Sequence, residues 1–263
     1  MRELTLDGTD LRVPRLSFGT ASLHHCVTSR QRQVLLSHAF DCGFTHFDAS
    51  PYYGYGLAET ELGRLPVSLR NRLTVSSKVG LYPPLETSSW PVVMGIKAGG
   101  RIRPAWKRSA WNGSLERADR SLAATLRRLN RTHLDILFLH EPLWAETPPE
   151  PWLAWLEKKR SAGQIRFWGV AGEPVRLRDF LERESPLAQI LQCRDSRTGE
   201  GAGSSLLNAR FPHLVYGVLG GIPPDERKAA VERALDQHPR ASILVSSRRL
   251  DHVSELAGWV AER

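Results

Sequence analysis

The sequence predicts an α/β fold: a closed (β/α)8 TIM barrel, in which eight parallel strands alternate with helices. Eight short apolar runs of β character recur along the 263 residues, and amphipathic stretches of helical period lie between them. Such alternation implies a parallel sheet. Units of about 31 residues have the usual size for a closed barrel of this kind. We expect a single barrel domain over residues 1–263.

The predicted strands are short apolar runs, several of which end in polar residues. In chain order they cover residues 16–23, 45–50, 73–81, 134–141, 165–172, 188–195, 214–220 and 241–247. The first residues, 2–16, alternate between apolar and polar side chains and turn at Asp7-Gly8. This pattern predicts a short N-terminal β-hairpin ahead of the first barrel strand.

The clearest predicted helices are amphipathic stretches between these strands. They cover residues 30–43, 114–130, 150–163, 225–239 and 250–263. Ser114, followed by Glu116 and Asp119, is typical of a helix start. Gly43 and Gly163 are typical of helix ends.

The remaining connections carry weaker patterns. The link after residues 45–50 is one, and no full helix is expected around residues 201–212. Residues 82–112 show no clear element, and loops of this length in compact domains are usually functional or disordered. This loop contains five basic residues and three tryptophans, Trp90, Trp106 and Trp111. We expect it to be ordered and to lie over the mouth of the barrel.

The competing fold is an open, doubly wound sheet. It would need a Gly-x-Gly-x-x-Gly turn after its first strand. Residues 23–28, LHHCVT, follow the first predicted strand without that motif, and the stretch from Gly54 to Glu59 lacks the third glycine. The barrel is therefore favoured.

Composition bounds the partners. The net charge is +8, but lysine and arginine are spread over several helical stretches. A nucleic-acid partner would gather the charge on one element, so none is expected. The charge fits solvated faces or an anionic small ligand. No apolar run is long enough to cross a membrane, and no membrane partner is expected.

Compartment is indicated by the N-terminus and the cysteines. The first residues lack the apolar core of a signal peptide. The cysteines are Cys26, Cys42 and Cys193, with no Cys-x-x-Cys pair. This pattern favours reduced thiols and a cytoplasmic location.

Four polar residues follow three consecutive predicted strands. Asp48, Lys78 and His140 lie at strand ends, and Tyr53 lies on the turn after the first of these strands. Taken singly, each has a structural explanation, such as capping for Asp48 or packing for Tyr53. The C-terminal strand ends of a barrel meet at one mouth, where active sites form. One such site explains all four residues together.

The stretches around these residues resemble the aldo-keto reductase family. The resemblance is carried by GFTHFDASPYYGYGLAETELGR (43–64), SSKVG (76–80), RLNRTHLDILFLHEP (128–142), GQIRFWGV (163–170) and ILVSSRRLDHVSEL (243–256). It implies an NADP(H)-dependent oxidoreductase that reduces an aldehyde or ketone to an alcohol, or catalyses the reverse. The substrate would be a small carbonyl compound or alcohol, and no metal is required.

The resemblance also implies catalytic roles for the four residues. Tyr53 would supply the proton, although a phenol with a pKa of about 10 is a poor acid–base group until its anion is stabilised. The Lys78 ammonium would favour the phenolate, and Asp48 would hold that ammonium. His140 would donate to the substrate oxygen.

A second set of residues is implied for NADP(H). It comprises Gly19, Thr20, Gln192, Ser246, Ser247, Arg248 and Arg249. Gly19 and Thr20 would lie near the nicotinamide, and Gln192 would hold its carboxamide. Residues 246–249 would offer backbone donors and two cations to the adenosine 2′-phosphate, which favours NADP over NAD.

The chain also departs from the family pattern. Where the family usually has Gly-Val-Ser-Asn, this chain has Gly169-Val-Ala171-Gly172, so that carboxamide contact is lost or supplied differently. Asp195 replaces an aromatic that usually stacks under the nicotinamide. His252 stands where many members carry an arginine.

Two alternatives to the reductase stay open. The first, which the departures motivate, is a reductase-like protein that has lost turnover and serves as a binding or regulatory subunit. The second is a metal-dependent hydrolase with His24, His25, His46 and Asp48 as ligands. Such a site would need further ligands on later strands, and only His140 is well placed to be one.

Overall fold

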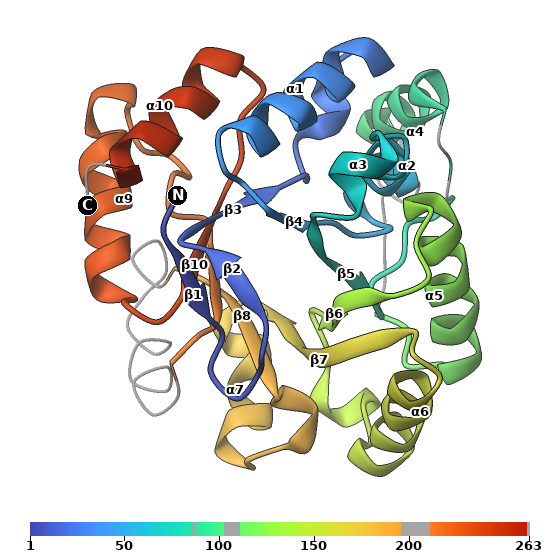
Figure 1. Ribbon diagram of the computed structural model, residues 1–263. Coiled ribbons are helices and arrows are strands. Elements are labelled where there is room, and N and C mark those ends of the chain that lie inside the picture. The colour runs from blue at the N-terminus through green and yellow to red at the C-terminus, as the bar shows by residue number, and fades with distance from the viewer. Residues whose placement is uncertain (86, 88, 103–110, 196–210, 262–263) are drawn as a thin grey trace.

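The computed structural model describes residues 1–85, 87, 89–102, 111–195 and 211–261, and it contains a closed barrel ringed by helices (Figure 1). Eight parallel strands close the barrel in the order β10-β3-β4-β5-β6-β7-β8-β9. They are β3 (Leu16–Gly19), β4 (His46–Asp48), β5 (Thr74–Val79), β6 (Leu134–His140), β7 (Ile165–Gly172), β8 (Ile190–Arg194), β9 (Leu214–Tyr216) and β10 (Ser242–Val245). Each predicted strand region contains one of them, so the predicted barrel is confirmed.

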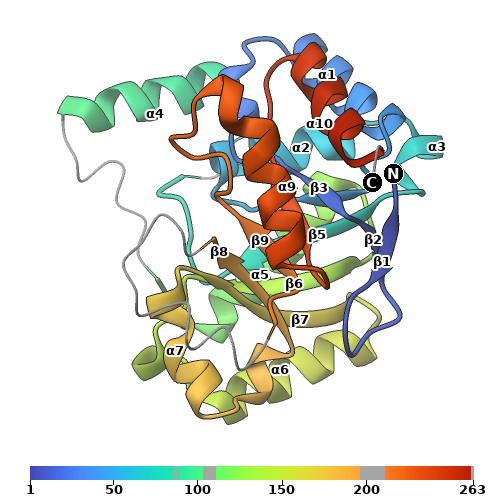
Figure 2. The same cartoon turned by 90° about the vertical axis from the view of Figure 1, so that its left-hand side faces the viewer.

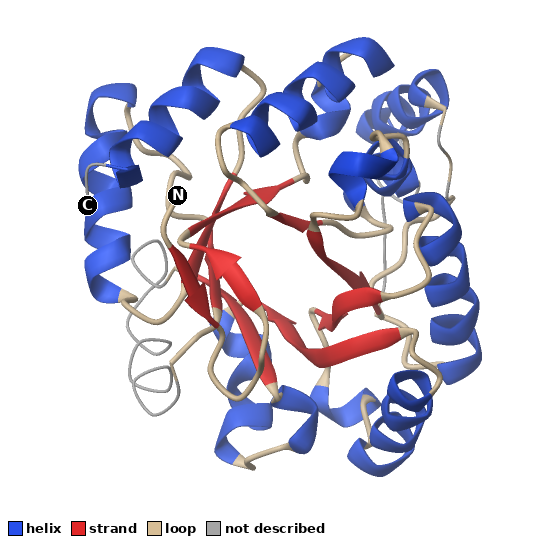
Figure 3. Cartoon of the chain, in the orientation of Figure 1, coloured by secondary structure: helices blue, strands red, loops and turns tan. Residues whose placement is uncertain are grey.

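Helices cover the outer face of the barrel (Figure 3). They are α1 (Ser29–Asp41), α2 (Leu57–Gly63), α3 (Val67–Arg70), α4 (Trp90–Ile102), α5 (Leu115–Leu129), α6 (Pro149–Ser161), α7 (Pro174–Glu182), α9 (Arg227–Gln237) and α10 (Leu250–Ala261). Short 3-10 turns connect them: η1 (Leu23–His25), η2 (Tyr53–Gly56), η4 (Trp144–Glu146), η5 (Pro186–Ala188) and η7 (Pro224–Glu226). The five predicted helices correspond to α1, α5, α6, α9 and α10.

The predicted end signals form hydrogen-bonded caps. The Ser114 side chain accepts a hydrogen bond from Arg117 N at the start of α5. Gly43 follows α1 with φ 92° and its N donates to Phe40 O, and Gly163 follows α6 with φ 69° and its N donates to Arg160 O. Such caps satisfy backbone groups that have no partner within the helix.

The expectation of no clear element in residues 82–112 is wrong, because α4 lies there. The glycines Gly95, Gly99 and Gly100 lower helix propensity and obscure the periodic pattern. The helix is stabilised by tertiary packing, since Val93 is fully buried in a cluster with Tyr55 and Leu57. Figure 2 shows α4 extending outward on the side of the fold opposite the N-terminal hairpin.

Two of the three tryptophans of this loop can be placed in the structure. Trp90 and Trp111 lie in described parts of the chain, and the Trp90 indole donates to His24 O at 2.9 Å. Trp106 lies outside the described residues.

The link after the strand at 165–172 contains α7, which was not among the predicted helices.

The predicted N-terminal hairpin is confirmed. Strands β1 (Glu3–Thr5) and β2 (Arg12–Pro14) pair antiparallel. Leu6, Leu11 and Val13 are buried, and they pack on residues inside the barrel such as Ile136 and Phe138. The hairpin therefore closes the N-terminal end of the barrel, as its place across the barrel in Figure 1 suggests.

The main hydrophobic core lies between the strands and the surrounding helices. Its fully buried members include Phe44, Leu36, Leu156, Phe180 and Leu256. Burial of one such side chain stabilises the fold by about 1.5–3 kcal/mol. Within the described part of the chain, no helix has the length and apolar character to cross a membrane.

Candidate active site

The ends of β4 and β5 hold a buried ion pair. Lys78 Nζ lies 2.5 Å from Asp48 Oδ1 and 2.6 Å from Oδ2, and it also donates to Ala49 O at 3.0 Å. A buried ammonium is costly unless it is paired. Burial lowers the pKa of Lys78, while the charge of Asp48 opposes that shift.

Tyr53 joins this pair from the turn after β4. Its hydroxyl lies 3.4 Å from Asp48 Oδ2, and Lys78 Nζ lies 4.8 Å from the centre of its ring. The turn reverses through three left-handed residues: Gly54 with φ 62°, Tyr55 with φ 59° and Gly56 with φ 100°. Glycine adopts this backbone without strain, which explains its place on either side of Tyr55.

Tyr53 keeps its proton strongly. Burial raises its pKa well above the usual value, and the Asp48 charge and hydrogen bond add to the shift. Burial first, and Asp48 second, thus outweigh the stabilisation of the phenolate expected from Lys78, whose ammonium is paired with Asp48. The group is therefore a protonated phenol that can act as a hydrogen-bond and proton donor.

His140 ends β6 beside the tyrosine. Its ring meets the Tyr53 ring edge to face, with 6.1 Å between centroids, and Nδ1 lies 3.5 Å from Ser50 Oγ. Burial, and secondly the Lys78 charge, lower the pKa of His140 well below its usual value. A neutral ring that accepts from Ser50 carries its proton on Nε2, where it can donate to a ligand.

Gln192 enters the same cluster from β8. Its Nε2 donates to Asp48 Oδ1 at 3.0 Å, a contact that was not predicted. Its Oε1 is buried and has no hydrogen-bond partner among the described residues. A buried amide oxygen without a donor is uncommon in proteins. This atom is suited to accept an N–H group from a ligand.

Gly19 and Thr20 connect the cluster to β10. Thr20 N and Oγ1 both donate to Asp48 O, at 3.0 and 2.8 Å. A Cβ atom on Gly19 would lie 3.6 Å from Val245 O and 4.0 Å from Ser246 Cβ. The two residues therefore lie between the buried cluster and the start of α10.

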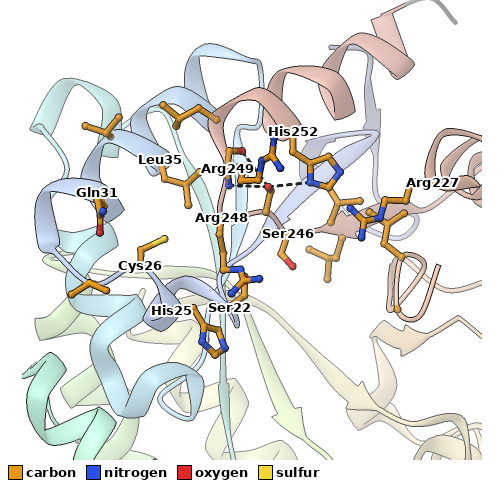
Figure 4. Close-up of a pocket in the computed structure, with 18 of the residues that line it drawn as sticks. Ser22, His25, Cys26, Gln31, Leu35, Arg227, Ser246, Arg248, Arg249 and His252 are labelled. Carbon is orange, nitrogen blue, oxygen red and sulfur yellow. Dashed lines mark hydrogen bonds between the residues drawn. The ribbon is translucent and has the colours of Figure 1, made fainter. Parts of the chain in front are cut away.

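A groove with a volume of about 1050 Å³ lies beside the start of α10 (Figure 4). Residues of η1, α1, the segment after β9 and the segment between β10 and α10 line it. Ser246, Ser247, Arg248 and Arg249 are in its lining, whereas Asp48, Tyr53, Lys78 and His140 are not. In Figure 4, Arg248 points toward Ser22 and His25.

The two predicted arginines differ in their surroundings. Arg249 is exposed and paired with Asp251, with Nε 3.0 Å from Oδ1. Arg248 forms no ion pair within the part of the chain that the structure describes. Ser247 Oγ accepts a hydrogen bond from Arg249 N and lies 3.1 Å from His252 Nδ1. These two contacts form a turn at the start of α10.

Sequence reasoning missed two residues of the site. Arg227, at the start of α9, lines the groove and adds a cation to it. Tyr216, at the end of β9, lies close enough to Tyr53 to affect its titration and forms a side-chain hydrogen bond to Glu141. An aromatic residue at a strand end, directly before a glycine, was the available signal for Tyr216.

Carboxylates occupy the rim where the chain departs from the family pattern. Glu141 Oε2 accepts from Glu173 N at 3.2 Å, and Glu173 pairs with Arg194 at 2.8 Å. Burial raises the pKa of Glu141. A Cβ atom on Gly172 would lie only 2.8 Å from Glu141 Oε2. A side chain at position 172 would therefore require the Glu141 carboxylate to shift.

Asp195 is buried at the end of β8. Its N donates to Tyr216 O at 2.8 Å, and its Oδ1 lies 3.9 Å from His238 Nε2 on the α9 side.

The histidines considered as metal ligands have other partners. His46 contacts Thr74 Oγ1 and Ser76 Oγ through its two nitrogens, at 2.9 and 3.3 Å. His24 Nε2 lies 2.8 Å from Lys97 Nζ. Among the described residues, no three potential ligands of the His, Cys, Asp and Glu types lie together as a metal site would need.

Comparison with known families gives one match over most of the chain. Residues 15–190 match a model described as the aldo/keto reductase family. A D-threo-aldose 1-dehydrogenase of Pseudomonas sp is 27% identical over 166 residues, which is 61% of this chain and 50% of that protein. An L-glyceraldehyde 3-phosphate reductase of Escherichia coli K12 is 28% identical over 243 residues, 82% of this chain and 64% of that protein.

The chain spans about half the length of the first curated relatives and matches solved structures over a larger share. An aldo-keto reductase of Bacillus halodurans in its holo form superposes with a TM-score of 0.76 at 18% identity, over 99% of this chain and 91% of that one. An aldo-keto reductase of Klebsiella pneumoniae in complex with NADPH gives 0.72 at 21% identity, over 99% and 90%. At these identities the likeness shows the fold.

Proposed function

The chain belongs to the aldo/keto reductase family, and we propose that it is an NADP(H)-dependent oxidoreductase that reduces an aldehyde or ketone to an alcohol, or catalyses the reverse. The observation that carries this proposal is the buried cluster of Asp48, Lys78, Tyr53 and His140 at one mouth of the barrel.

The residues around the cluster fit the cofactor. Gln192 Oε1 is buried without a partner and suits the N–H of a carboxamide. Arg248 and Arg227 line a groove that is large enough for an extended ligand. Cations and a helix N-terminus together favour phosphate groups. We therefore propose that Gln192, Gly19 and Thr20 lie near the nicotinamide and that residues 246–249 bind the adenosine phosphate.

The chain's own residues would handle the proton. The hydride for the carbonyl carbon comes from the bound cofactor. His140 Nε2–H would donate to the carbonyl oxygen and orient it. As that oxygen gains negative charge, Tyr53 would transfer its phenolic proton to it. Lys78 would lie beside the phenolate that remains and stabilise it, and Asp48 would hold the Lys78 ammonium in place.

The raised pKa of Tyr53 agrees with a role as proton donor in the reducing direction. Burial, and secondly the Asp48 charge, keep the phenol protonated, which is the form that donates to a developing alkoxide.

For the substrate we propose a small polyhydroxylated carbonyl compound. The names of several relatives refer to an aldose, a galactose and a glyceraldehyde phosphate. The rim of this barrel carries Glu141, Glu173 and Arg194, which could bind hydroxyl groups. A cytoplasmic location is proposed as well, since Cys26, Cys42 and Cys193 are free thiols.

A titration followed by an activity screen tests the proposal. NADPH and NADH are titrated against the intrinsic fluorescence of the protein, which has eight tryptophans. Consumption of NADPH is then followed over a panel of aldehydes, ketones and sugars. We expect tighter binding of NADPH than of NADH and turnover with at least one carbonyl class. Tight binding without turnover would favour the non-catalytic subunit, and absence of binding would overturn the proposal.

A further inference from the structure

A chain of hydrogen bonds leads from the N-terminal half of β5 to the Asp48 carboxylate. Thr74 Oγ1 lies 2.9 Å from His46 Nδ1, and His46 Nε2 lies 3.3 Å from Ser76 Oγ. Ser76 Oγ donates to Asp48 Oδ1 at 2.8 Å. His46 and Ser76 are fully buried, and Thr74 is half-buried. Three side chains thus connect in series beneath the ion pair.

The strand geometry explains why these residues meet. His46 pairs with Thr74 and Asp48 pairs with Ser76 in the β4–β5 register. Residues two apart on a strand point to the same face, so His46 and Asp48 share one face of β4, as Thr74 and Ser76 do on β5. The interiors of such barrels are mostly filled by branched apolar side chains. Polar residues at these positions therefore indicate a specific role.

The protons in this chain have a defined direction. The Asp48 carboxylate, paired with Lys78, can only accept hydrogen bonds, so Ser76 must give it its single hydroxyl proton. The Ser76 oxygen can then only accept from His46, which places a proton on His46 Nε2. His46 Nδ1 is left as an acceptor for the Thr74 hydroxyl, at 2.9 Å, in competition with Thr45 O at 3.3 Å. Each group therefore donates toward Asp48.

The state of the histidine agrees with this direction. Complete burial is the main factor that lowers the pKa of His46 to about 4. The ring is therefore neutral at physiological pH, and a neutral ring has one donor and one acceptor nitrogen. Its two neighbours require this combination.

We propose that Ser76 and His46 are positioning residues that fix the orientation of the Asp48 carboxylate beneath Lys78 and Tyr53. Hydrogen bonds from Ser76 and Gln192 hold Asp48 Oδ1 in place. Oδ2 is thereby directed toward the Tyr53 hydroxyl. Removal of the Ser76 hydroxyl would free one side of the carboxylate and leave His46 Nε2–H without its acceptor. The inference rests on the proposed function of Tyr53.

A neighbouring serine provides a matched control. Ser77 is buried in the same strand, and its hydroxyl donates to the buried Glu59 carboxylate at 2.5 Å. Among the described residues, no hydrogen bond joins the Ser77 side chain to Asp48. A general effect of removing a buried hydroxyl from β5 should therefore appear in both Ser76→Ala and Ser77→Ala.

The first test compares the kinetics of the two variants on the carbonyl that the wild type reduces. For Ser76→Ala we expect kcat to fall about tenfold to a hundredfold, as for loss of one hydrogen bond to a charged group. KM for the carbonyl and the Kd of NADPH should stay close to wild type. Ser77→Ala should keep its kcat, and Ser76→Thr should recover activity because it keeps the hydroxyl. Equal kcat values for Ser76→Ala and wild type would overturn the inference.

The second test does not depend on activity. NMR of isotope-labelled histidine in the wild-type protein reports which ring nitrogen carries the proton, and His46→Gln identifies the His46 signals. We expect a neutral ring with the proton on Nε2. A proton on Nδ1 would overturn the chain, even if Ser76→Ala failed to fold. A wild type with the expected His46 signals but no turnover would refute the proposed function and leave the chain of hydrogen bonds in place.

Discussion

Lys78 Nζ lies 2.5 Å from Asp48 Oδ1, and each of the two residues is only 2% exposed. The pair brings a cation to the end of β5, where Tyr53 and His140 converge on it. Because both charges are out of water, each depends on the other. The same contact thus affects the stability of the barrel and the chemistry at its mouth.

The first prediction concerns stability. Lys78→Met should lower the free energy of unfolding by about 3–5 kcal/mol, because it leaves the Asp48 carboxylate buried without its cation. The double variant Asp48→Asn, Lys78→Met should recover part of this loss. Urea denaturation of the three proteins provides the measurement. A single variant as stable as wild type would show that the pair is not energetically coupled.

A partly exposed pair serves as the control for that measurement. Lys159 pairs with Asp119, whose side chain is 50% exposed. Water and salt screen such a contact, and Lys159→Met should cost about 1 kcal/mol or less. A loss as large as that of Lys78→Met would mean that burial is not the deciding factor.

The second prediction concerns cofactor preference. Arg248 points into the groove, so Arg248→Ala should weaken NADPH binding about tenfold or more while changing NADH binding little. Arg249→Ala should have a smaller effect, because Arg249 is exposed and already paired with Asp251. Fluorescence titration with both cofactors distinguishes the two. Equal losses in the two variants would contradict this assignment.

The third prediction concerns pH. His46 has a pKa of about 4 in the folded protein against an ordinary value of 6.5, so the unfolded state binds more protons between these values. The stabilisation from a neutral His46 is complete above about pH 6.5 and is lost as the pH falls toward 4. This residue alone should account for about 3 kcal/mol. Denaturation measured across this range gives the slope.

Replacement of the histidine tests the origin of that slope. His46→Gln cannot take up the proton, so the free energy of unfolding should depend less steeply on pH. The slope should differ from that of the wild type by the amount expected for one proton, about 1.4 kcal/mol per pH unit. An unchanged slope would assign the effect to other titrating groups.

Much of the fold could be predicted because it depends on local patterns. Strands of a closed barrel are buried on both faces, and so they read as apolar runs. The helix α4 was missed because its glycines reduce the periodic signal, while Val93 and its contacts with Tyr55 and Leu57 come from distant parts of the chain. Tertiary packing, which no window of sequence contains, decided that segment.

The site was predictable in its residue types and less so in its contacts. Strand ends placed Asp48 and Lys78 together, since neighbouring parallel strands end at the same mouth. The bonds from Ser76 and Gln192 to Asp48 depend on side-chain rotamers, which the sequence does not reveal. The direction of the Tyr53 pKa shift also required the structure, because it depends on the balance between burial and two opposite charges.

The most direct test of the proposed chemistry is the rate of NADPH oxidation by a carbonyl substrate in Tyr53→Phe and in the wild type. We predict that the rate in Tyr53→Phe falls about a hundredfold to ten-thousandfold, as for loss of a general acid, and that the Kd of NADPH is unchanged. Equal rates in the two proteins would contradict the assignment of Tyr53 as the proton donor.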